Sequence, residues 1–279
     1  MIDSLAAAAT TQYLDAPGGR FAYRRLGTSQ GVPLVLAQRF RGTIDHWDPT
    51  FLDLLATERD VIIFDNLGTG RSTGDAPTTI DGLAAGLLEF VKALDLDQAD
   101  FFGWSLGGIV VQAAALQGPD EVRRLVVAGS SPGGGIPGQP APDPRVWQVA
   151  TKEANDDEDF LYLFFPDTPT GRDLGLASLR RIDARVLDHA HAPVTAATTA
   201  AQLSVITSIG SSIWNRLTEL TMPVLVATGA QDVMINAYAS FAMTSALPDA
   251  KLVIYSDAGH GFLYQHVHDF TGEVLDFLR

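Results

Sequence analysis

The feature that most constrains this chain is a Gly-x-Ser-x-Gly pentapeptide at residues 103–107, with Ser105 at its centre. The pentapeptide follows an apolar run at residues 99–102 and precedes a helix-forming run at residues 109–116. A serine at such a strand-to-helix turn occupies a sharp, strained corner that exposes its hydroxyl group. Small residues two positions before and after it avoid collisions with the neighbouring strand and helix. The pattern predicts a reactive serine at the end of a sheet strand.

Short, mostly apolar segments alternate with segments of helical periodicity along much of the chain. The expected strands lie at residues 33–37, 61–64, 99–102, 125–128, 223–228 and 251–255, after an opening hairpin at residues 11–26. The expected helices lie at residues 46–56, 80–94, 109–116, 236–247 and 266–278. This alternation is typical of a mostly parallel sheet with helices on both faces. A length of 279 residues suits one large α/β domain.

The alternation stops in the middle of the chain. Residues 132–144 are rich in proline and glycine, which indicates a linker without regular structure. Residues 145–215 show helical patterns and no convincing strand. The simplest interpretation is a helical cap, or lid, inserted at residues 136–215. The α/β core is then formed by residues 1–135 and 216–279.

A serine hydroxyl becomes a useful nucleophile when a base, usually a histidine oriented by a carboxylate, takes its proton. Asp232 follows the predicted strand at residues 223–228, and His260 follows the strand at residues 251–255. Parallel strands place their carboxyl ends along one edge of the sheet, where ligands bind. We therefore predict that Ser105 is the nucleophile, His260 the base and Asp232 the acid that orients it.

Other candidate residues fit a functional role less well. Asp257 lies only three positions before His260, too close for an easy approach to the imidazole. Asp65 with Gly68 and Gly70 mimics a dinucleotide-binding fingerprint, but the glycine spacing differs from G-x-G-x-x-G. We interpret that segment as a structural turn.

From residue 11 to residue 279 the chain resembles the α/β-hydrolase fold superfamily. The motifs that carry the resemblance are Asp65-x-x-Gly68-x-Gly70-x-Ser72, the Ser105 turn, Gly229-x-x-Asp232 and Gly259-His260. The sequence Gly-Trp-Ser-Leu-Gly-Gly at residues 103–108 is similar to that of capped carboxylesterases, such as those acting on pimeloyl esters. The capped branch also includes lactonases, carbon–carbon bond hydrolases and cofactor-free haloperoxidases or perhydrolases. A serine at this turn speaks against the branches that use aspartate there.

The segment after the third strand departs from the family pattern. The family usually has His-Gly at this position, whereas this chain has Gln38 and Arg39. By position, the resemblance implies that the backbone N–H groups of Phe40 and Leu106 form the oxyanion hole. Backbone donors do not depend on side-chain identity, so the hole can persist. We expect Gln38, Arg39 and Trp104 to contact the substrate.

Composition narrows the possible partners. A net charge of −14 argues against nucleic acid, whose phosphates require a basic face. The absence of cysteine excludes disulfides, thiolate catalysis and cysteine-based zinc sites. No apolar run reaches membrane length, and the first residues lack the basic region of a signal peptide. We predict a cytoplasmic protein with no membrane partner, no metal and no organic cofactor; the sequence does not determine its oligomeric state.

The predicted function is hydrolysis of a small to medium, largely apolar carboxylic ester or lactone through an acyl-enzyme. One alternative keeps the triad but changes the chemistry to perhydrolysis, haloperoxidation or carbon–carbon bond cleavage. Another, suggested by the altered loop, is a non-catalytic ligand-binding relative. The aromatic stretch at residues 160–165 is interpreted as cap core or, with Trp147 or Trp214, as an apolar wall over the serine.

Overall fold

The computed structural model describes residues 4–28, 31–188, 192–207 and 212–279. Its centre is an eight-stranded sheet with the order β1-β2-β4-β3-β5-β6-β7-β8. The strands are β1 (Gln12–Ala16), β2 (Gly19–Gly27), β3 (Leu34–Ala37), β4 (Asp60–Phe64), β5 (Ala99–Trp104), β6 (Val122–Ala128), β7 (Val224–Gly229) and β8 (Ala250–Tyr255). Strand β2 pairs antiparallel with both β1 and β4 at one side of the sheet, and all other pairings are parallel. Every residue of β3, β4, β5 and β7 is buried, which explains why these strands are nearly all apolar.

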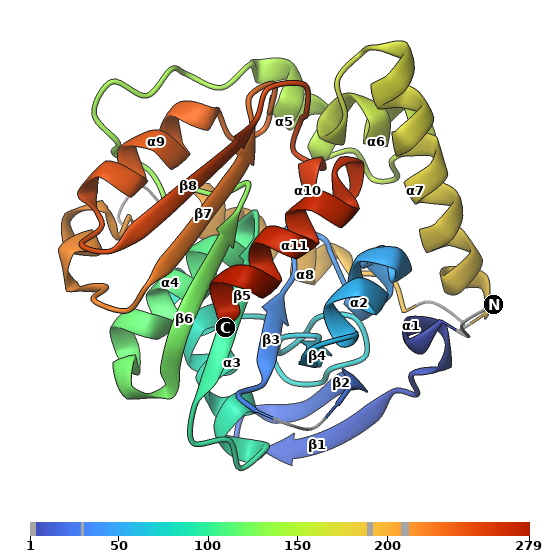
Figure 1. The fold of residues 1–279 in the computed structure, drawn as a ribbon. Coiled ribbons are helices and arrows are strands. Elements are labelled where there is room, and N and C mark those ends of the chain that lie inside the picture. Colours follow the sequence, from blue (N-terminus) through green and yellow to red (C-terminus); the bar gives the residue numbers. More distant parts are fainter. Residues whose placement is uncertain (1–3, 29–30, 189–191, 208–211) are drawn as a thin grey trace.

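Helices cover both faces of the sheet (Figure 1). The helices on one face are α1 (Leu5–Ala8), α2 (Pro49–Ala56), α10 (Phe262–Gln265) and α11 (Val267–Leu278). The helices on the other face are α3 (Ile80–Ala93), α4 (Leu106–Gln117) and α9 (Ala237–Ala246). Two apolar clusters, one on each face, form the core. The predicted α/β fold class is confirmed.

The described part of the segment between β6 and β7 begins without regular structure, at residues 129–143, and continues with helices. Its helices are α5 (Pro144–Ala150), α6 (Asp157–Phe164), α7 (Pro169–Asp188), α8 (Ala196–Thr207) and the 3-10 helix η4 (Trp214–Glu219). Apolar side chains of α5, α6 and α7 join the cluster beneath α2 and α11, while those of α8 and η4 join the other. The insertion therefore shares the core of the sheet. Its treatment as a separate cap at residues 136–215 stays a prediction. His189 and His191, which follow no predicted strand and are therefore expected to be structural or exposed, lie outside the described residues.

The helix predicted at residues 46–56 begins later than its apolar pattern indicated. We expected it to start at His46, but α2 starts at Pro49, where Asp48 accepts the N–H of Thr50 at 2.9 Å. A proline favours the first helical position and disfavours a helical conformation in the residue before it. The preceding Ile44–His46 instead forms the short 3-10 helix η1. A second one, η2 (Pro119–Glu121), precedes β6.

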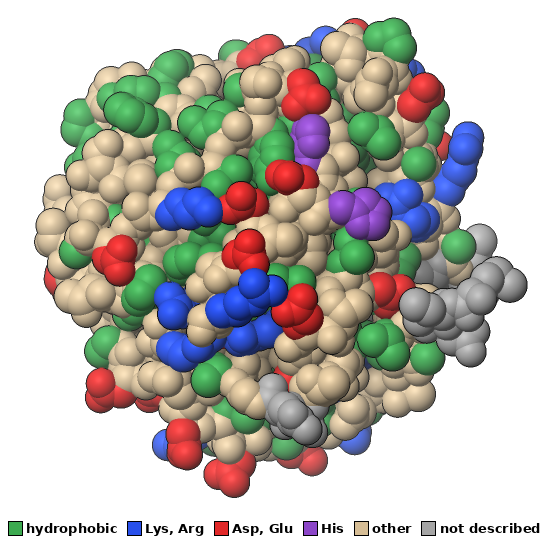
Figure 2. Space-filling view, in the orientation of Figure 1, with side chains coloured by type: hydrophobic (Ala, Val, Ile, Leu, Met, Phe, Trp, Pro, Cys, Tyr) green, Lys and Arg blue, Asp and Glu red, His purple; other side chains and the backbone are tan. Residues whose placement is uncertain are grey.

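Basic side chains gather near the amino ends of the central strands, in the lower middle of the face in Figure 2. Arg59, before β4, and Arg123, in β6, both pair with Asp100, whose side chain is fully buried. This cluster lies at the opposite end of β5 from Ser105. Within the described ranges, no helix combines the length and apolar character needed to cross a membrane.

Candidate active site

Ser105 lies at the turn between β5 and α4 in a strained backbone conformation. Its φ of 59° and ψ of −119° are unusual for a residue other than glycine. Its N–H donates to the carbonyl of Ala128 on β6 at 2.9 Å, which holds the turn against the sheet. A Cβ on Gly107 would lie 2.1 Å from the carbonyl oxygen of Ala37. The glycine is therefore required because α4 passes directly against the end of β3.

Asp232 and His260 form a buried hydrogen-bonded pair. Asp232 follows β7 and His260 follows β8, and their Oδ2 and Nδ1 atoms lie 2.7 Å apart. Both side chains are fully buried. The other carboxylate oxygen, Oδ1, accepts the N–H groups of Met234 and Ile235, each at 2.8 Å. These two bonds fix the carboxylate so that Oδ2 faces the imidazole.

The imidazole of His260 presents one nitrogen without a partner. Its Nε2 atom is buried and has no hydrogen bond to any described residue. Because Nδ1 donates to Asp232, Nε2 is left as the acceptor of the neutral ring. The ring packs against Trp104 and Phe164 with centroid distances of 5.7 and 5.5 Å. The indole N–H of Trp104 also donates to the His260 carbonyl at 3.1 Å, so the histidine is held at both its ring and its backbone.

Two cavities meet at Ser105. The smaller, of about 90 Å³, is also bordered by His260. Its walls are Arg39, Phe40, Arg41, Ser105, Ala150, Asn155, Phe160, Leu163, Phe164, Met234 and His260. The larger, of about 560 Å³, is mostly apolar and extends toward α5, with Trp147 in its wall. Ser105, Phe40 and Met234 border both spaces. The hydroxyl, the free imidazole nitrogen and ligand-sized space thus come together at the carboxyl ends of the strands.

Phe40 and Leu106 are the expected oxyanion-hole donors. The N–H groups of Arg39 and Arg41 are bonded to glutamine side chains at 2.9 Å. In contrast, the N–H of Phe40 has no hydrogen bond to any residue that the structure describes. Leu106 is the first residue of α4, where an N–H has no partner inside the helix. Both residues border the larger cavity together with Ser105. Their assignment to an oxyanion hole stays a prediction.

The three residues expected to contact substrate lie in different surroundings. Arg39 borders the small cavity with Ser105. Gln38 is turned toward its own loop, where Oε1 accepts the Arg39 N–H, and it borders a separate space of about 40 Å³ that Ser105 does not line. Trp104 is completely buried and borders neither cavity beside Ser105. Arg39 thus shares a cavity wall with Ser105, whereas Trp104 packs against the ring of His260 and binds its carbonyl.

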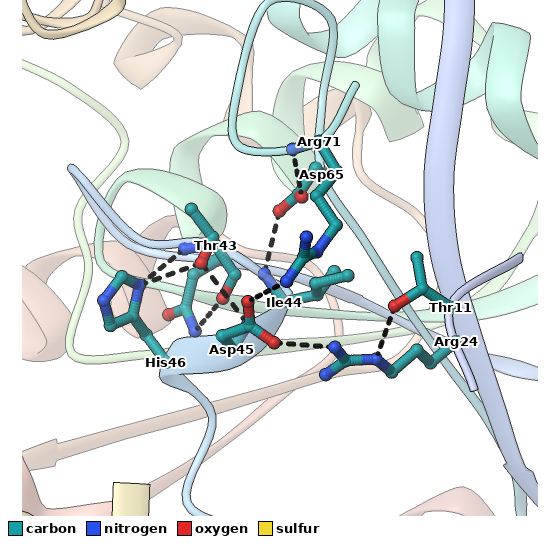
Figure 3. Close-up of polar contacts among 9 residues, drawn as sticks. Thr11, Arg24, Thr43, Ile44, Asp45, His46, Asp65 and Arg71 are labelled. Atoms are coloured by element: carbon teal, nitrogen blue, oxygen red, sulfur yellow. Dashed lines mark hydrogen bonds and ion pairs between the residues drawn. The ribbon is translucent and has the colours of Figure 1, made fainter. Parts of the chain in front are cut away.

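A buried polar network anchors the segment that follows this loop (Figure 3). Asp65, at the end of β4, accepts the N–H groups of Ile44 and Arg71 at 2.8 and 3.0 Å. Burial raises its pKa to about 7. Beside it, Asp45 bridges the guanidinium groups of Arg24 at 2.7 Å and Arg71 at 3.3 Å. The Asp65 motif forms a structural turn that binds the backbone of the segment following the loop after β3.

Arg41 is a site residue that sequence reasoning missed. Its guanidinium donates to the carbonyls of Ala150, Lys152 and Glu153 at 3.2, 2.7 and 2.9 Å. It also donates to the side chain of Asn155 at 3.2 Å. This one side chain ties the loop after β3 to the helical insertion. Its partners are mainly backbone carbonyls more than 100 positions away, and such partners leave no side-chain pattern in a sequence.

The aromatic stretch of α6 serves both roles that its sequence suggested. Phe160 and Phe164 stack on each other with a centroid distance of 4.5 Å. Both rings also line the small cavity beside Ser105. Trp147 of α5 borders the larger cavity, whereas Trp214 packs against the core on the α3 and α4 side of the sheet. The wall over the serine therefore comes from α5 and α6.

The family model described as alpha/beta hydrolase fold matches residues 32–267. The chain belongs to the α/β hydrolase fold family. A solved structure of an α/β hydrolase fold protein from Chitinophaga pinensis is 36% identical, with a TM-score of 0.88 over 98% of both chains. This α/β hydrolase is accordingly an enzyme of the family.

Two curated relatives of this α/β hydrolase differ in length and in kind. Polyketide synthase ThaQ of Burkholderia thailandensis is 29% identical over 97% of the chain, but the chain spans only 13% of that protein. A non-heme chloroperoxidase of Streptomyces lividans is 28% identical over 94% of the chain and 97% of its own length. Relatives of this α/β hydrolase thus include both a stand-alone enzyme and a small part of a large synthase.

Proposed function

We propose that this α/β hydrolase is a serine hydrolase that cleaves a carboxylic ester or lactone through an acyl-enzyme. The observation that carries the proposal is the His260 imidazole. It is fixed by Asp232 through Nδ1, while Nε2 is buried without a partner in a cavity that Ser105 also borders. A buried polar atom normally has a hydrogen-bond partner, so an unpaired one beside a strained serine suits proton transfer.

In the proposed reaction, Oγ of Ser105 attacks the ester carbonyl as Nε2 of His260 takes its proton. The N–H groups of Phe40 and Leu106 stabilise the negative charge that develops on the carbonyl oxygen. The bond to the alcohol oxygen then breaks, and His260 returns the proton to that oxygen. Water attacks the acyl-enzyme with His260 again as base, which releases the acid and restores the serine. Asp232 stabilises the imidazolium at each step.

The chloroperoxidase relative supports a second candidate activity at the same site. If hydrogen peroxide replaces water in the second half-reaction, its oxygen attacks the acyl-enzyme and a peracid leaves. The peracid, not the protein, then oxidises halide. The first half-reaction is unchanged, so both activities require Ser105 and His260.

A fluorophosphonate probe tests the shared step. We expect it to label the wild-type protein and not Ser105→Ala. Ser131→Ala is the matched control, because Ser131 borders the larger cavity but has no histidine partner among the described residues. This control should label normally. A folded wild type that resists labelling and turns over no ester or lactone would instead favour a non-catalytic binding protein.

Peroxide separates the two chemistries in proteins that label. Ester and lactone hydrolysis is measured first without peroxide, by proton release. Halogenation of a dye is then measured with acetate, hydrogen peroxide and bromide. Hydrolysis with negligible halogenation supports the esterase or lactonase proposal, and the reverse result supports the peracid chemistry.

A further inference from the structure

Arg39 places a positive charge in the wall of the small cavity beside Ser105 and His260. The residue is half-buried, and its Nε atom is buried without a hydrogen-bond partner. One terminal nitrogen donates to the carbonyl of Phe40 at 2.9 Å. Within the described part of the chain, Arg39 forms no ion pair with a carboxylate. The guanidinium thus keeps unused donors next to the proposed nucleophile.

Three other shielded arginines of this chain are each paired with an aspartate. Arg24 pairs with Asp45, and Arg181 pairs with Asp48. Arg59 likewise pairs with Asp100. Removing a charge from water is costly unless an opposite charge or hydrogen bonds replace the water. Among the described residues, Arg39 has no carboxylate partner and its guanidinium makes one hydrogen bond, to the Phe40 carbonyl. Burial lowers its pKa to about 10, so it remains charged at neutral pH.

The second arginine in the same wall does not share this property. Arg41 uses its guanidinium to bind carbonyl and amide oxygens of the helical insertion. Arg39 and Arg41 also border an outer cavity that contains Glu153, Asp156, Asp157 and Asp183. No ion pair joins Arg39 to any of these four carboxylates in the structure. Of the two arginines that line the small cavity, Arg39 is therefore the one with hydrogen-bond donors left for a ligand.

Two aromatic rings hold the Arg39 guanidinium in place. Its central carbon lies 5.1 Å from the ring centroid of Phe164 and 5.7 Å from that of Trp104. Arginine stacks well on aromatic faces, and its planar fork matches the two oxygens of a carboxylate. A guanidinium fixed in this way needs little reorganisation when it binds an anion.

The two cavities differ in a way that suits a substrate with two unlike ends. The small cavity of about 90 Å³ contains Arg39 and holds several water-sized groups. The larger cavity of about 560 Å³ is mostly apolar. Ser105 borders both, so a scissile carbonyl at Ser105 would direct one end of the substrate into each.

We propose that Arg39 binds a carboxylate of the substrate, which makes the substrate an ester or lactone with a short acidic arm and a larger apolar part. This inference rests on the proposed function and refines its substrate class. The acid lies on one side of the scissile carbonyl, in the small cavity, and the apolar part lies on the other.

Matched pairs of esters test this proposal. One series has the acid on the acyl side: mono-4-nitrophenyl succinate and glutarate, each paired with the compound whose free carboxylate is methylated. The other has it on the alcohol side: hexanoate esters of glycolate and 3-hydroxypropanoate, again with methylated partners. The readout is the ratio of kcat/KM for the acid to that for its methyl ester. For wild type we expect a ratio of about 10 or more in at least one series, as for a charge-assisted hydrogen bond.

Variants assign the preference to Arg39. Arg39→Gln should bring the ratio to about 1, and Arg39→Lys should give an intermediate value because it keeps the charge without the planar fork. Arg145→Gln is the matched control, since Arg145 is exposed on α5, stacks on Tyr162 and borders neither cavity at Ser105. It should keep the wild-type ratio. Thermal unfolding of each variant checks that it folds.

Calorimetry in a Ser105→Ala background separates this proposal from the serine mechanism. The acid-bearing ester should bind this variant, and adding Arg39→Gln should weaken binding about tenfold or more, whether or not Ser105 is the nucleophile. A wild-type ratio near or below 1 in both series would overturn the proposal. So would an equal loss of kcat/KM for both members of a pair in Arg39→Gln, which would limit Arg39 to holding the Phe40 carbonyl.

Discussion

Two buried aspartates near the site have opposite surroundings. Asp45 lies behind the loop after β3, where its carboxylate contacts the guanidinium groups of Arg24 and Arg71 (Figure 3). Asp232 lies at the end of β7, where its carboxylate binds His260, and Nε2 of that imidazole has no partner among the described residues. The negative charge of Asp45 is therefore neutralised by two guanidinium groups. The hydrogen-bonded pair of Asp232 and His260 instead borders a cavity beside Ser105.

The difference teaches how burial can serve stability at one place and chemistry at another. A buried ion pair whose members satisfy each other contributes structure, and removing one member leaves an uncompensated charge. A buried hydrogen-bond network whose last polar atom is unpaired and faces a cavity is prepared to bind a ligand. Three Asp→Asn substitutions, which change the side chain very little in size, probe this contrast.

Asp232→Asn should have the largest effect. Because Oδ1 is held by the N–H groups of Met234 and Ile235, the amide nitrogen must replace Oδ2 and donate to His260. The imidazole then carries its proton on Nε2 and cannot accept one from Ser105. We expect kcat to fall about 10⁴-fold with little change in fold. Ester hydrolysis measured beside circular dichroism checks this, and near-normal kcat would remove Asp232 from the proposed triad.

Asp45→Asn should instead act mainly on stability. It leaves the buried Arg24 guanidinium without its ion-pair partner, which typically lowers the free energy of unfolding by about 3–5 kcal/mol. Urea unfolding measures the change, and activity per folded molecule should fall far less than in Asp232→Asn. Asp15→Asn, which breaks an exposed pair with Arg20, is the control and should barely alter stability. If Asp45→Asn matched Asp232→Asn in lost kcat, the contrast would fail.

Asp65→Asn tests a pH dependence of stability. Burial raises the Asp65 pKa from its ordinary value of 3.8 to about 7, so the native state binds more protons than the unfolded state between these values. The contribution of Asp65 to stability is therefore complete below pH 4 and is lost as the pH rises through 7. The free energy of unfolding of wild type, relative to Asp65→Asn, should fall by up to about 1.4 kcal/mol per pH unit in this window. A constant difference from pH 4 to pH 8 would contradict this.

The sequence carried most of the architecture because local patterns set it. The Gly-x-Ser-x-Gly turn, the apolar strands and the resumption of the alternation near residue 222 each depend on residues close together in the chain. The predicted start of α2 was wrong, because the apolar pattern of the sequence extends before Pro49. The positions of Asp232 and His260 at adjacent strand ends could be predicted because parallel strands align their carboxyl ends.

The walls of the site depended on contacts that no local pattern encodes. Arg39 and Arg41 are two positions apart, are chemically identical and both border the small cavity. Arg41 binds carbonyl oxygens of the insertion, whereas Arg39 keeps unused donors. Gln38 was expected at the substrate and folds back on its own loop. Trp104, beside the serine in sequence, is buried beneath His260.

The order of residues alone determined the sheet, the strained serine and the strand ends where an acid and a base follow, because backbone geometry and the burial of apolar strands act over short stretches of chain. Only the tertiary structure decided which charges are neutralised and which stay open to a ligand. Whether a guanidinium meets a carboxylate, a carbonyl or a cavity depends on residues distant in the sequence. The aspartates that pair with Arg24 and Arg59 lie 21 and 41 positions away. The carbonyl partners of Arg41 lie more than 100 positions away and meet it only when the helices between β6 and β7 pack over the sheet.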